Sequence, residues 1–326
     1  MTITRLPVAL LCAASSLLLL SGCAHKSEGP AGRRIAGIVF QEDQFFRLAL
    51  FGMRDAALRE GATLLEANSA GKPDKEIQLV NTYIAQKVDA IVISPLSARA
   101  SISALERARA GGIIVITYNT TIESPVPAAY IESDHTDLGA STGRAARAFI
   151  GQHLGGTANI ALLAFVSQLP EQSSQRSEGF IREVTQLPGV RIVARQDAWL
   201  AEQAVKKAGD ILTAHPEVNV IWAANEGGTV GAVMAVKNAG KAGTVAVFGT
   251  DTGEQLADFL LADDNILQAV TGQQPFEIGS LAVETAIRAL RGEPVEARRA
   301  LPGKLLSRTM PDSVRAFKQR LHAMIQ

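Results

Sequence analysis

The segment from residue 90 to residue 117, AIVISPLSARASISALERARAGGIIVIT, decides the fold class of this chain. It opens with a short apolar, β-branched run, Ala90 to Ser94, which Pro95 ends. An amphipathic stretch with helical character, Ala98 to Ala110, comes next, and after two glycines a second β-branched run covers Ile113 to Thr117. This order predicts two parallel strands joined by a crossover helix.

The same βα unit recurs on both sides of this segment, in two sets. The first set has further strands at 35–40 and 63–67 and helices at 46–60 and 74–86. The second set, after a helix at 136–153, has strands at 159–165, 191–195, 220–223, 244–248 and 266–270, with helices at 175–186, 201–214, 229–239 and 253–261. Two sets predict an α/β protein with two Rossmann-like lobes, each a parallel sheet covered on both faces. A basic helix from Asp312 to Met324 is expected as a surface appendage.

The N-terminal residues predict export. Arg5 precedes an apolar run, residues 8–20, that is too short to span a bilayer and has the length of a signal-peptide core. The sequence Leu20-Ser21-Gly22-Cys23 resembles a bacterial lipobox, whose cysteine is lipidated. Residues 1–22 are therefore expected to be removed and residues 23–34 to form a flexible tether. The mature protein would lie in the periplasm or cell envelope, held to a membrane only by the lipid on Cys23; the alternative is an ordinary secretory signal with a chance cysteine.

Composition argues against several other classes. The chain is 47% hydrophobic and 5% aromatic, which suits packed α/β layers and is too apolar for disorder. Removing residues 1–22 takes out only Arg5, so 31 of the 32 basic side chains remain against 32 acidic ones, and this balance does not attract nucleic acid. The five histidines lack metal-ligand spacing. No Walker sequence, nucleophile elbow or HExxH motif occurs, so we expect no enzyme, no metal and no cofactor.

Candidate binding residues follow the strands, because ligands of open parallel sheets lie beyond the carboxyl ends of the strands. In the first set these are Asp43, Phe45 and Phe46 after the first strand and Asn119 and Thr120 after the fourth. In the second set they are Arg176, Trp199, Asn225, Asp251 and Gln273. Sugars and polyols present hydroxyls beside weakly apolar C–H groups, and amide, carboxylate and guanidinium groups beside aromatic rings suit them.

Each candidate also has a structural explanation. The alternatives are core packing for Phe45, Phe46 and Trp199, helix capping for Asp251, turn formation for Asn119 and Asn225, and an exposed helix position for Arg176. Their occurrence together at equivalent strand ends favours a shared site.

Several segments resemble the periplasmic ribose-binding-like sugar-binding proteins of ABC importers, which have the type I Venus-flytrap fold. The most specific are residues 43–46 (DQFF), 86–91 (QKVDAI), 133–143 (SDHTDLGASTG), 176–180 (RSEGF), 214–218 (AHPEV) and 249–251 (GTD). The resemblance runs from about residue 35 to residue 306. It implies a three-stranded hinge, crossed near Ser133, Gln274 and Pro302. The lobes would be residues 35–133 with 274–302 and residues 134–273 with 303–310, and residues 311–326 would lie outside both.

The resemblance also implies roles for the candidate residues. Phe46 and Trp199 would face the sugar ring, and the hydroxyls would be bound by Arg176, Asn225 and Asp251, with Asp43, Phe45 and Gln273 as further contacts. The chain departs from ribose binders at three places. Asn119-Thr120 stands where ribose binders have an Asp-Arg pair, Asp43 stands in place of an asparagine, and Thr250 stands in place of an aromatic residue. A neutral pair replaces a charged bidentate contact, which argues against ribose itself and suggests a polyol, a deoxysugar or another pentose.

The function implied is that of a monomeric, non-enzymatic binding lipoprotein that closes its lobes on a sugar or polyol and delivers it to an ABC permease. One alternative is a sensing protein that presents the ligand to a sensor kinase or chemoreceptor. Another is a regulator of the LacI type, which would need a helix-turn-helix before Ile35, where this chain has an export signal. A third alternative is a sugar-active or nucleotide-binding enzyme, and turnover in a substrate panel would support this alternative.

Overall fold

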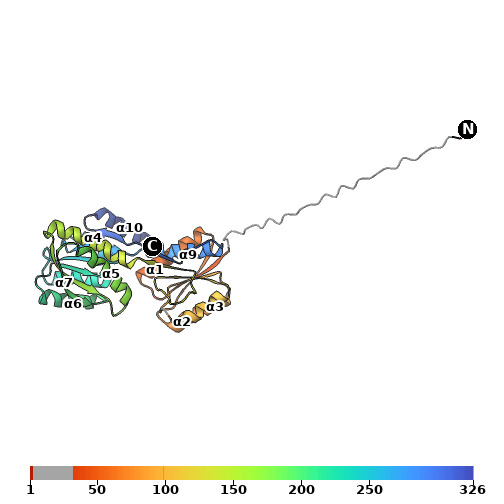
Figure 1. Cartoon of the computed structure of the whole chain (residues 1–326), viewed down its shortest axis with the longest axis horizontal. Helices are drawn as coiled ribbons and strands as arrows, with labels where there is room; N and C mark the ends of the chain where they lie inside the picture. Colours follow the sequence, from red (N-terminus) through yellow and green to blue (C-terminus); the bar gives the residue numbers. More distant parts are fainter. Residues whose placement is uncertain (3–31, 98, 326) are drawn as a thin grey trace.

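The computed structural model of this protein describes residues 1–2, 32–97 and 99–325. Two α/β lobes lie next to each other along the long axis of the molecule (Figure 1). Residues 3–22 of the predicted signal sequence and Cys23 lie outside the described residues. Within the described ranges, no helix combines the length and apolar composition needed to cross a bilayer.

The first lobe contains a parallel six-stranded sheet in the order β11-β5-β4-β3-β1-β2. Its strands are β1 (Arg34–Val39), β2 (Thr63–Asn68), β3 (Ala90–Ile93), β4 (Ile114–Tyr118), β5 (Ala129–Ser133) and β11 (Arg298–Leu301). Its helices are α1 (Gln44–Arg59), α2 (Pro73–Ala85), α3 (Ile102–Ala110) and α9 (Pro275–Leu290).

The second lobe contains a six-stranded sheet in the order β12-β10-β9-β8-β6-β7, in which only β12 is antiparallel to its neighbour. Its strands are β6 (Thr157–Ala164), β7 (Gly189–Asp197), β8 (Val220–Ala223), β9 (Ala246–Thr250), β10 (Leu267–Gly272) and β12 (Lys304–Ser307). Its helices are α4 (His135–His153), α5 (Pro170–Val184), α6 (Ala201–Ala214), α7 (Glu226–Asn238), α8 (Glu254–Leu261) and α10 (Pro311–Ile325).

The chain passes between the two sheets three times, from β5 to α4, from β10 to α9 and from β11 to β12. The predicted α/β fold with two parallel-sheet lobes is confirmed. Four elements were not among those predicted: β5, α9, β11 and β12. The strands β11 and β12 have only four residues each. They are defined by their hydrogen bonds to distant strands, β11 to β5 and β12 to β10.

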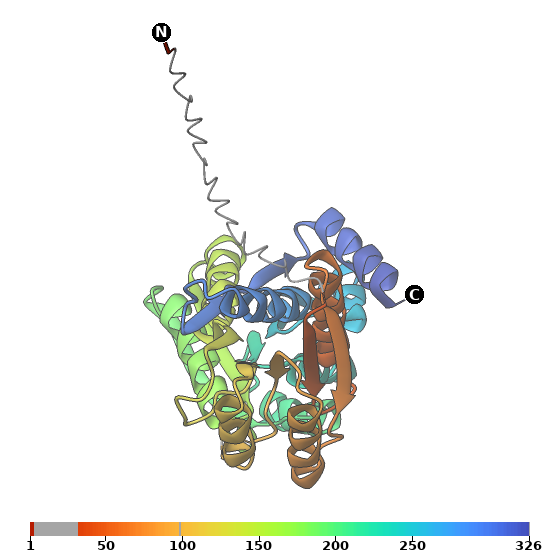
Figure 2. The same ribbon diagram turned by 90° about the vertical axis from the view of Figure 1, so that its right-hand side faces the viewer.

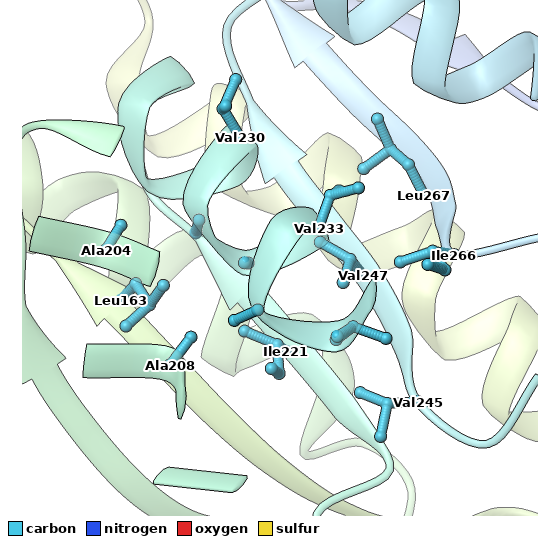
Figure 3. Close-up of a cluster of buried hydrophobic side chains, with 14 of the residues drawn as sticks. Leu163, Ala204, Ala208, Ile221, Val230, Val233, Val245, Val247, Ile266 and Leu267 are labelled. Atoms are coloured by element: carbon cyan, nitrogen blue, oxygen red, sulfur yellow. The ribbon is translucent and has the colours of Figure 1, made fainter. Parts of the chain in front are cut away.

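Both faces of each sheet are covered, and the strand β8 shows why. Ile221 and Ala223 belong to the apolar cluster on one face, and Val220 and Trp222 belong to the cluster on the other, because successive side chains of a strand point to opposite faces. Figure 3 shows the first cluster, in which Val233 of α7 lies against the sheet. Burial on both faces explains why this strand is apolar throughout.

The prediction that the C-terminal helix is a surface appendage is wrong. In α10 the side chains of Val314 and Leu321 are 0% and 4% exposed, and Val314 joins the core cluster of the second lobe. Apolar residues recur at positions 314, 317 and 321, one face of a helix, and this face packs toward α8. Figure 2 shows α10, in dark blue, against the body of the molecule. The helix is therefore an integral part of the second lobe.

Candidate functional site

A cavity of about 750 Å³ lies at the carboxyl ends of the strands and takes residues from both lobes. The structure places all of the predicted site residues except Thr120 in its lining: Asp43, Phe45, Phe46, Asn119, Arg176, Trp199, Asn225, Asp251 and Gln273. These residues come from loops far apart in the sequence, and the parallel strands bring them to one edge. Their role in ligand binding stays a prediction.

The centre of the cavity is a buried ion pair between Arg176 and Asp251. Nη1 of Arg176 donates to Oδ2 of Asp251 at 3.2 Å and to the carbonyl oxygen of Ala224 at 2.8 Å. The arginine is 3% exposed and the aspartate side chain is 19% exposed, so water reaches the pair only from the side of the aspartate. Asp251 also accepts hydrogen bonds from Nε2 of Gln273 at 2.9 Å and from the backbone N–H of Glu226 at 3.2 Å. With these donors in place, the carboxylate is held in one orientation before any ligand arrives.

The close crossing of helices α4 and α5 positions Arg176. A Cβ atom on Gly139 would lie 1.8 Å from the carbonyl oxygen of Arg176, and one on Gly179 would lie 2.1 Å from the carbonyl oxygen of Thr136. Only glycine allows the two backbones to approach so closely. Arg176 therefore sits on a helix that is held firmly against its neighbour, and a site built on such elements keeps its geometry.

His135 supports the arginine from the first turn of α4. Burial, with the guanidinium groups of Arg176 and Arg298 as further causes, lowers the pKa of His135 from 6.5 to about 3. The ring is therefore neutral, and its Nδ1 accepts a hydrogen bond from Nε of Arg176 at 3.3 Å. A positive charge on this ring would oppose the arginine.

Hydrogen bonds connect the central ion pair to the hinge. Oε1 of Gln273, which follows β10, accepts from Oγ of Ser133 at 2.8 Å, and Ser133 is the last residue of β5. The same glutamine donates to Asp251. Gln273 thus joins the polar centre to the point where the chain first leaves the first sheet.

Aromatic rings form the apolar part of the lining. Phe46 is 2% exposed and packs against Phe45 with ring centroids 5.2 Å apart. Trp199 is 37% exposed and meets Phe165 edge to face at 5.3 Å. The guanidinium of Arg176 lies 5.3 Å from the centre of the Phe165 ring. The cavity therefore has aromatic surfaces from both lobes beside its polar centre.

The turn after β4 explains why Thr120 is not in the lining. Asn119 has φ of 60°, a left-handed conformation that asparagine adopts more readily than most residues. The N–H of Thr120 donates to the carbonyl oxygen of Tyr118 at 2.6 Å, so the chain reverses tightly at this point. Thr120 is therefore the one predicted site residue that lies outside the lining, and its contact with a ligand stays a prediction. Asn119 lines the cavity and donates to Oγ of Ser94 at 3.3 Å.

Two candidates carry structural roles in addition to lining the cavity. The side chain of Asn225 accepts from the N–H of Gly228 at 3.1 Å, which caps α7, and donates to the carbonyl oxygen of Trp199 at 2.8 Å. Oδ1 of Asp43 accepts from the N–H of Phe46 at 3.0 Å and caps α1. Capping holds both side chains at the cavity edge of their helices.

Thr250 does not take the place of the missing aromatic residue. It is fully buried, it is absent from the lining, and within the described residues its hydroxyl has no hydrogen-bond partner. The ring in this region comes from Phe165 instead, which follows the last residue of β6. Its position at a strand end is the signal that could have identified it.

Glu226 is the lining residue of most consequence that the sequence did not single out. Burial raises its pKa from 4.5 to about 7, with the carboxylates of Asp251 and Asp43 as further causes. It directly follows the predicted residue Asn225, at the start of α7, and this position after β8 is the signal that could have found it. Gln44, Gln168, Gln172 and Gln255 add further amide groups to the lining.

The described part of the chain, residues 1–2, 32–97 and 99–325, holds no group of three or more His, Cys, Asp or Glu side chains placed to bind a metal ion. The cavity offers hydrogen-bonding groups and aromatic rings. Two parallel-sheet lobes that share such a cavity beside a three-stranded hinge define a bilobal solute-binding protein.

Comparison with known proteins agrees with this class. A family model described as the periplasmic binding protein domain matches residues 38–294. The ABC transporter periplasmic-binding protein YphF of Escherichia coli is 30% identical over 246 residues, which cover 73% of this chain and 74% of the relative. The ribose import binding protein RbsB of Bacillus subtilis is 27% identical over 304 residues, or 89% of this chain and 95% of the relative.

Among solved structures, a periplasmic solute-binding protein from Actinobacillus succinogenes with bound D-allose matches with a TM-score of 0.76 and 25% identity, covering 86% of this chain and 99% of that one. This chain belongs to the periplasmic binding protein family. Family membership places it in the periplasm or the cell envelope, and the named relatives are binding proteins rather than enzymes.

Proposed function

We propose that this protein captures a sugar or polyol in the cavity by lobe closure and delivers it to an ABC-type importer. The observation that carries the proposal is the Arg176–Asp251 pair, which shares one cavity with aromatic rings from both lobes. A ligand hydroxyl can donate a hydrogen bond to the carboxylate of such a pair and accept one from its guanidinium. The aromatic rings would contact the C–H faces of a sugar. Relatives named for ribose and for D-apiose import support the ligand class.

Closure follows from the division of the lining between the lobes. Asp43, Phe46 and Asn119 lie on the first lobe, and Arg176 and Asp251 lie on the second. A ligand that contacts both groups binds the closed form more tightly than the open form, and this difference shifts the equilibrium. The moving bodies would be residues 35–133 with 274–302 and residues 134–273 with 303–310. We extend the second body to include α10, which packs on α8.

Selectivity would come from the same polar groups. A ligand that lacks the matching hydroxyls leaves buried donors or acceptors without partners, at about 1–3 kcal/mol each. Asn119 provides a neutral amide where an Asp-Arg pair would provide two charges, so the ligand is not expected to be ribose.

The test is calorimetric titration with pentoses, hexoses and polyols, followed by Asp251→Asn. Asparagine tolerates the left-handed backbone at this position, where φ is 71°; it removes the charge and replaces one accepting oxygen by a donating NH2 group. Loss of a charge-assisted hydrogen bond, worth about 1.5–3 kcal/mol, is expected to weaken binding about tenfold or more. Thr120→Ala, outside the lining, is the control and is expected to bind as wild type. Wild-type affinity in Asp251→Asn would contradict the proposed site.

Three finer properties belong to the same proposal. The protein acts as a monomer without catalysis, and turnover of any ligand in the panel would contradict this. The lipid on Cys23 holds it at the membrane, with residues 23–34 as the tether. Cys23→Ala is expected to release the protein into the soluble fraction, and unchanged membrane fractionation would argue against the anchor.

A further inference from the structure

The cavity contains two carboxylates that the central ion pair does not use. Asp43 lies before α1 on the first lobe, and Glu226 begins α7 on the second. Both line the cavity. They are close enough that the charge of Asp43 contributes to the raised pKa of Glu226. One acidic side chain outside the central ion pair therefore faces the cavity from each lobe.

The carboxylate of Glu226 lies partly buried at the cavity wall. Among the described residues, no group donates a hydrogen bond to it, although it is partly buried. Its Oε1 lies against Gly253, where a Cβ atom would be only 2.4 Å away. Glycine at position 253, just before α8, leaves the space that this carboxylate occupies. The side chain is thus accommodated at the cavity wall but not neutralised there.

The charged groups around Glu226 do not compensate it. Asp251, after β9, and Asp43 are both carboxylates, and Arg176 of α5 is already bonded to Asp251. The remaining charged side chains of the lining are Glu277, Lys304 and Arg320. None of these last three contributes to the pKa shift of Glu226. Closing the lobes on an uncharged ligand would bring Asp43 and Glu226 together without a cation between them.

An ammonium group between these two carboxylates would resolve the repulsion. It has several N–H donors and no acceptor, so it can donate to one oxygen from each lobe. It would also restore the ionised form of Glu226, which burial and neighbouring carboxylates disfavour. Because it contacts both lobes, it would stabilise the closed form over the open form.

We propose that the ligand is a sugar or polyol that carries a protonated amine, and that Glu226 and Asp43 bind this amine from opposite lobes. The inference rests on the proposed function and specifies its substrate class. In this arrangement the Arg176–Asp251 pair binds hydroxyl groups, and the two other carboxylates select for positive charge.

Matched pairs of ligands test the inference by calorimetry at pH 7: D-glucosamine with D-glucose, D-galactosamine with D-galactose, and 1-amino-1-deoxy-D-sorbitol with D-sorbitol. In at least one pair the amine is expected to bind about tenfold more tightly than its neutral parent. Glu226→Gln is expected to remove most of this preference, measured as the ratio of the two affinities within each pair. Asp43→Asn is the second variant, because asparagine still caps α1 while the charge is lost.

The dependence on pH separates this inference from a neutral alternative. For 1-amino-1-deoxy-D-sorbitol, whose alkylamine keeps its proton across this range, affinity is expected to rise from pH 6 to pH 8 as Glu226 ionises, and Glu226→Gln is expected to abolish the rise. An affinity for 1-amino-1-deoxy-D-sorbitol that falls from pH 6 to pH 8 would overturn the inference, because it would show that the protonated form of Glu226 binds this ligand.

The remaining outcomes are also distinguishable. Equal or weaker binding of every amine relative to its parent overturns the inference and leaves the proposed function standing. If neither these pairs nor the neutral panel of pentoses, hexoses and polyols binds, the proposed function fails as well.

Discussion

Glu226→Gln is expected to make the ligand-free protein less sensitive to alkaline pH. In the folded protein the pKa of Glu226 is about 7, against an ordinary value of 4.5. Between these two values the folded state therefore holds a proton that the unfolded state has lost. Stability that depends on this proton is fully present below about pH 4.5, decreases as the pH rises and is lost above about pH 7.

The magnitude follows from the size of the pKa change. A rise from 4.5 to about 7 corresponds to about 3 kcal/mol of destabilisation once the group is ionised in both states. About 2.5 kcal/mol of this falls between pH 5 and pH 8. Glutamine has the same shape and no charge, so the variant should gain about 2.5 kcal/mol more over wild type at pH 8 than at pH 5. For a chain of this size the difference corresponds to roughly 4 °C in the melting temperature.

The measurement is urea unfolding of wild type and variant at both pH values, after bound ligand has been removed, because a ligand would stabilise the folded state by mass action. Glu277→Gln is the control, because Glu277 is an exposed carboxylate in the same lining. Its substitution should change the free energy of unfolding by the same amount at both pH values. An equal effect of Glu226→Gln at pH 5 and pH 8 would refute the electrostatic argument.

The other predictions concern packing and protonation. Gly52→Ala is expected to destabilise the protein by about 2 kcal/mol or more in urea unfolding, because the new Cβ would lie 1.9 Å from the carbonyl oxygen of Phe276. Gly209→Ala in α6 is the control, because no heavy atom lies within 4 Å of its new Cβ, and it should stabilise the protein by about 0.5–1 kcal/mol. Similar losses of stability in both variants would contradict the close crossing of α1 and α9. His135, with a pKa of about 3, is expected to remain neutral from about pH 4 to pH 8, with Nδ1 as the acceptor of Arg176; nitrogen NMR that showed it titrating in this window would disprove the contact.

Most helices and strands could be predicted because their signals are local. The run Val220 to Ala223 reads as a strand from its own residues, and the structure buries all four. The helix α9 also carried a local signal, with Pro275 at its start and apolar residues at 278, 282 and 286, although it was not predicted. Such patterns span a few residues, so the sequence contains them directly.

Elements that exist through distant contacts could not be predicted in the same way. The strand β12 has only four residues, and it pairs antiparallel with β10, which lies more than thirty positions earlier in the chain. The helix α10 was recognised as a helix, but its packing on α8 depends on where the second lobe ends. Local sequence carries no information about either neighbour.

The residue types that follow the strands could be found without a structure, and the geometry of a parallel sheet predicts that they meet at one edge. How these side chains interact depends on the folded chain. Asn119, whose backbone is left-handed, lines the cavity, whereas the next residue, Thr120, does not. The charge state of Glu226 depends on carboxylates that are 25 and 183 positions away in the chain, at residues 251 and 43. Electrostatic energy depends on distance in space, and folding sets that distance.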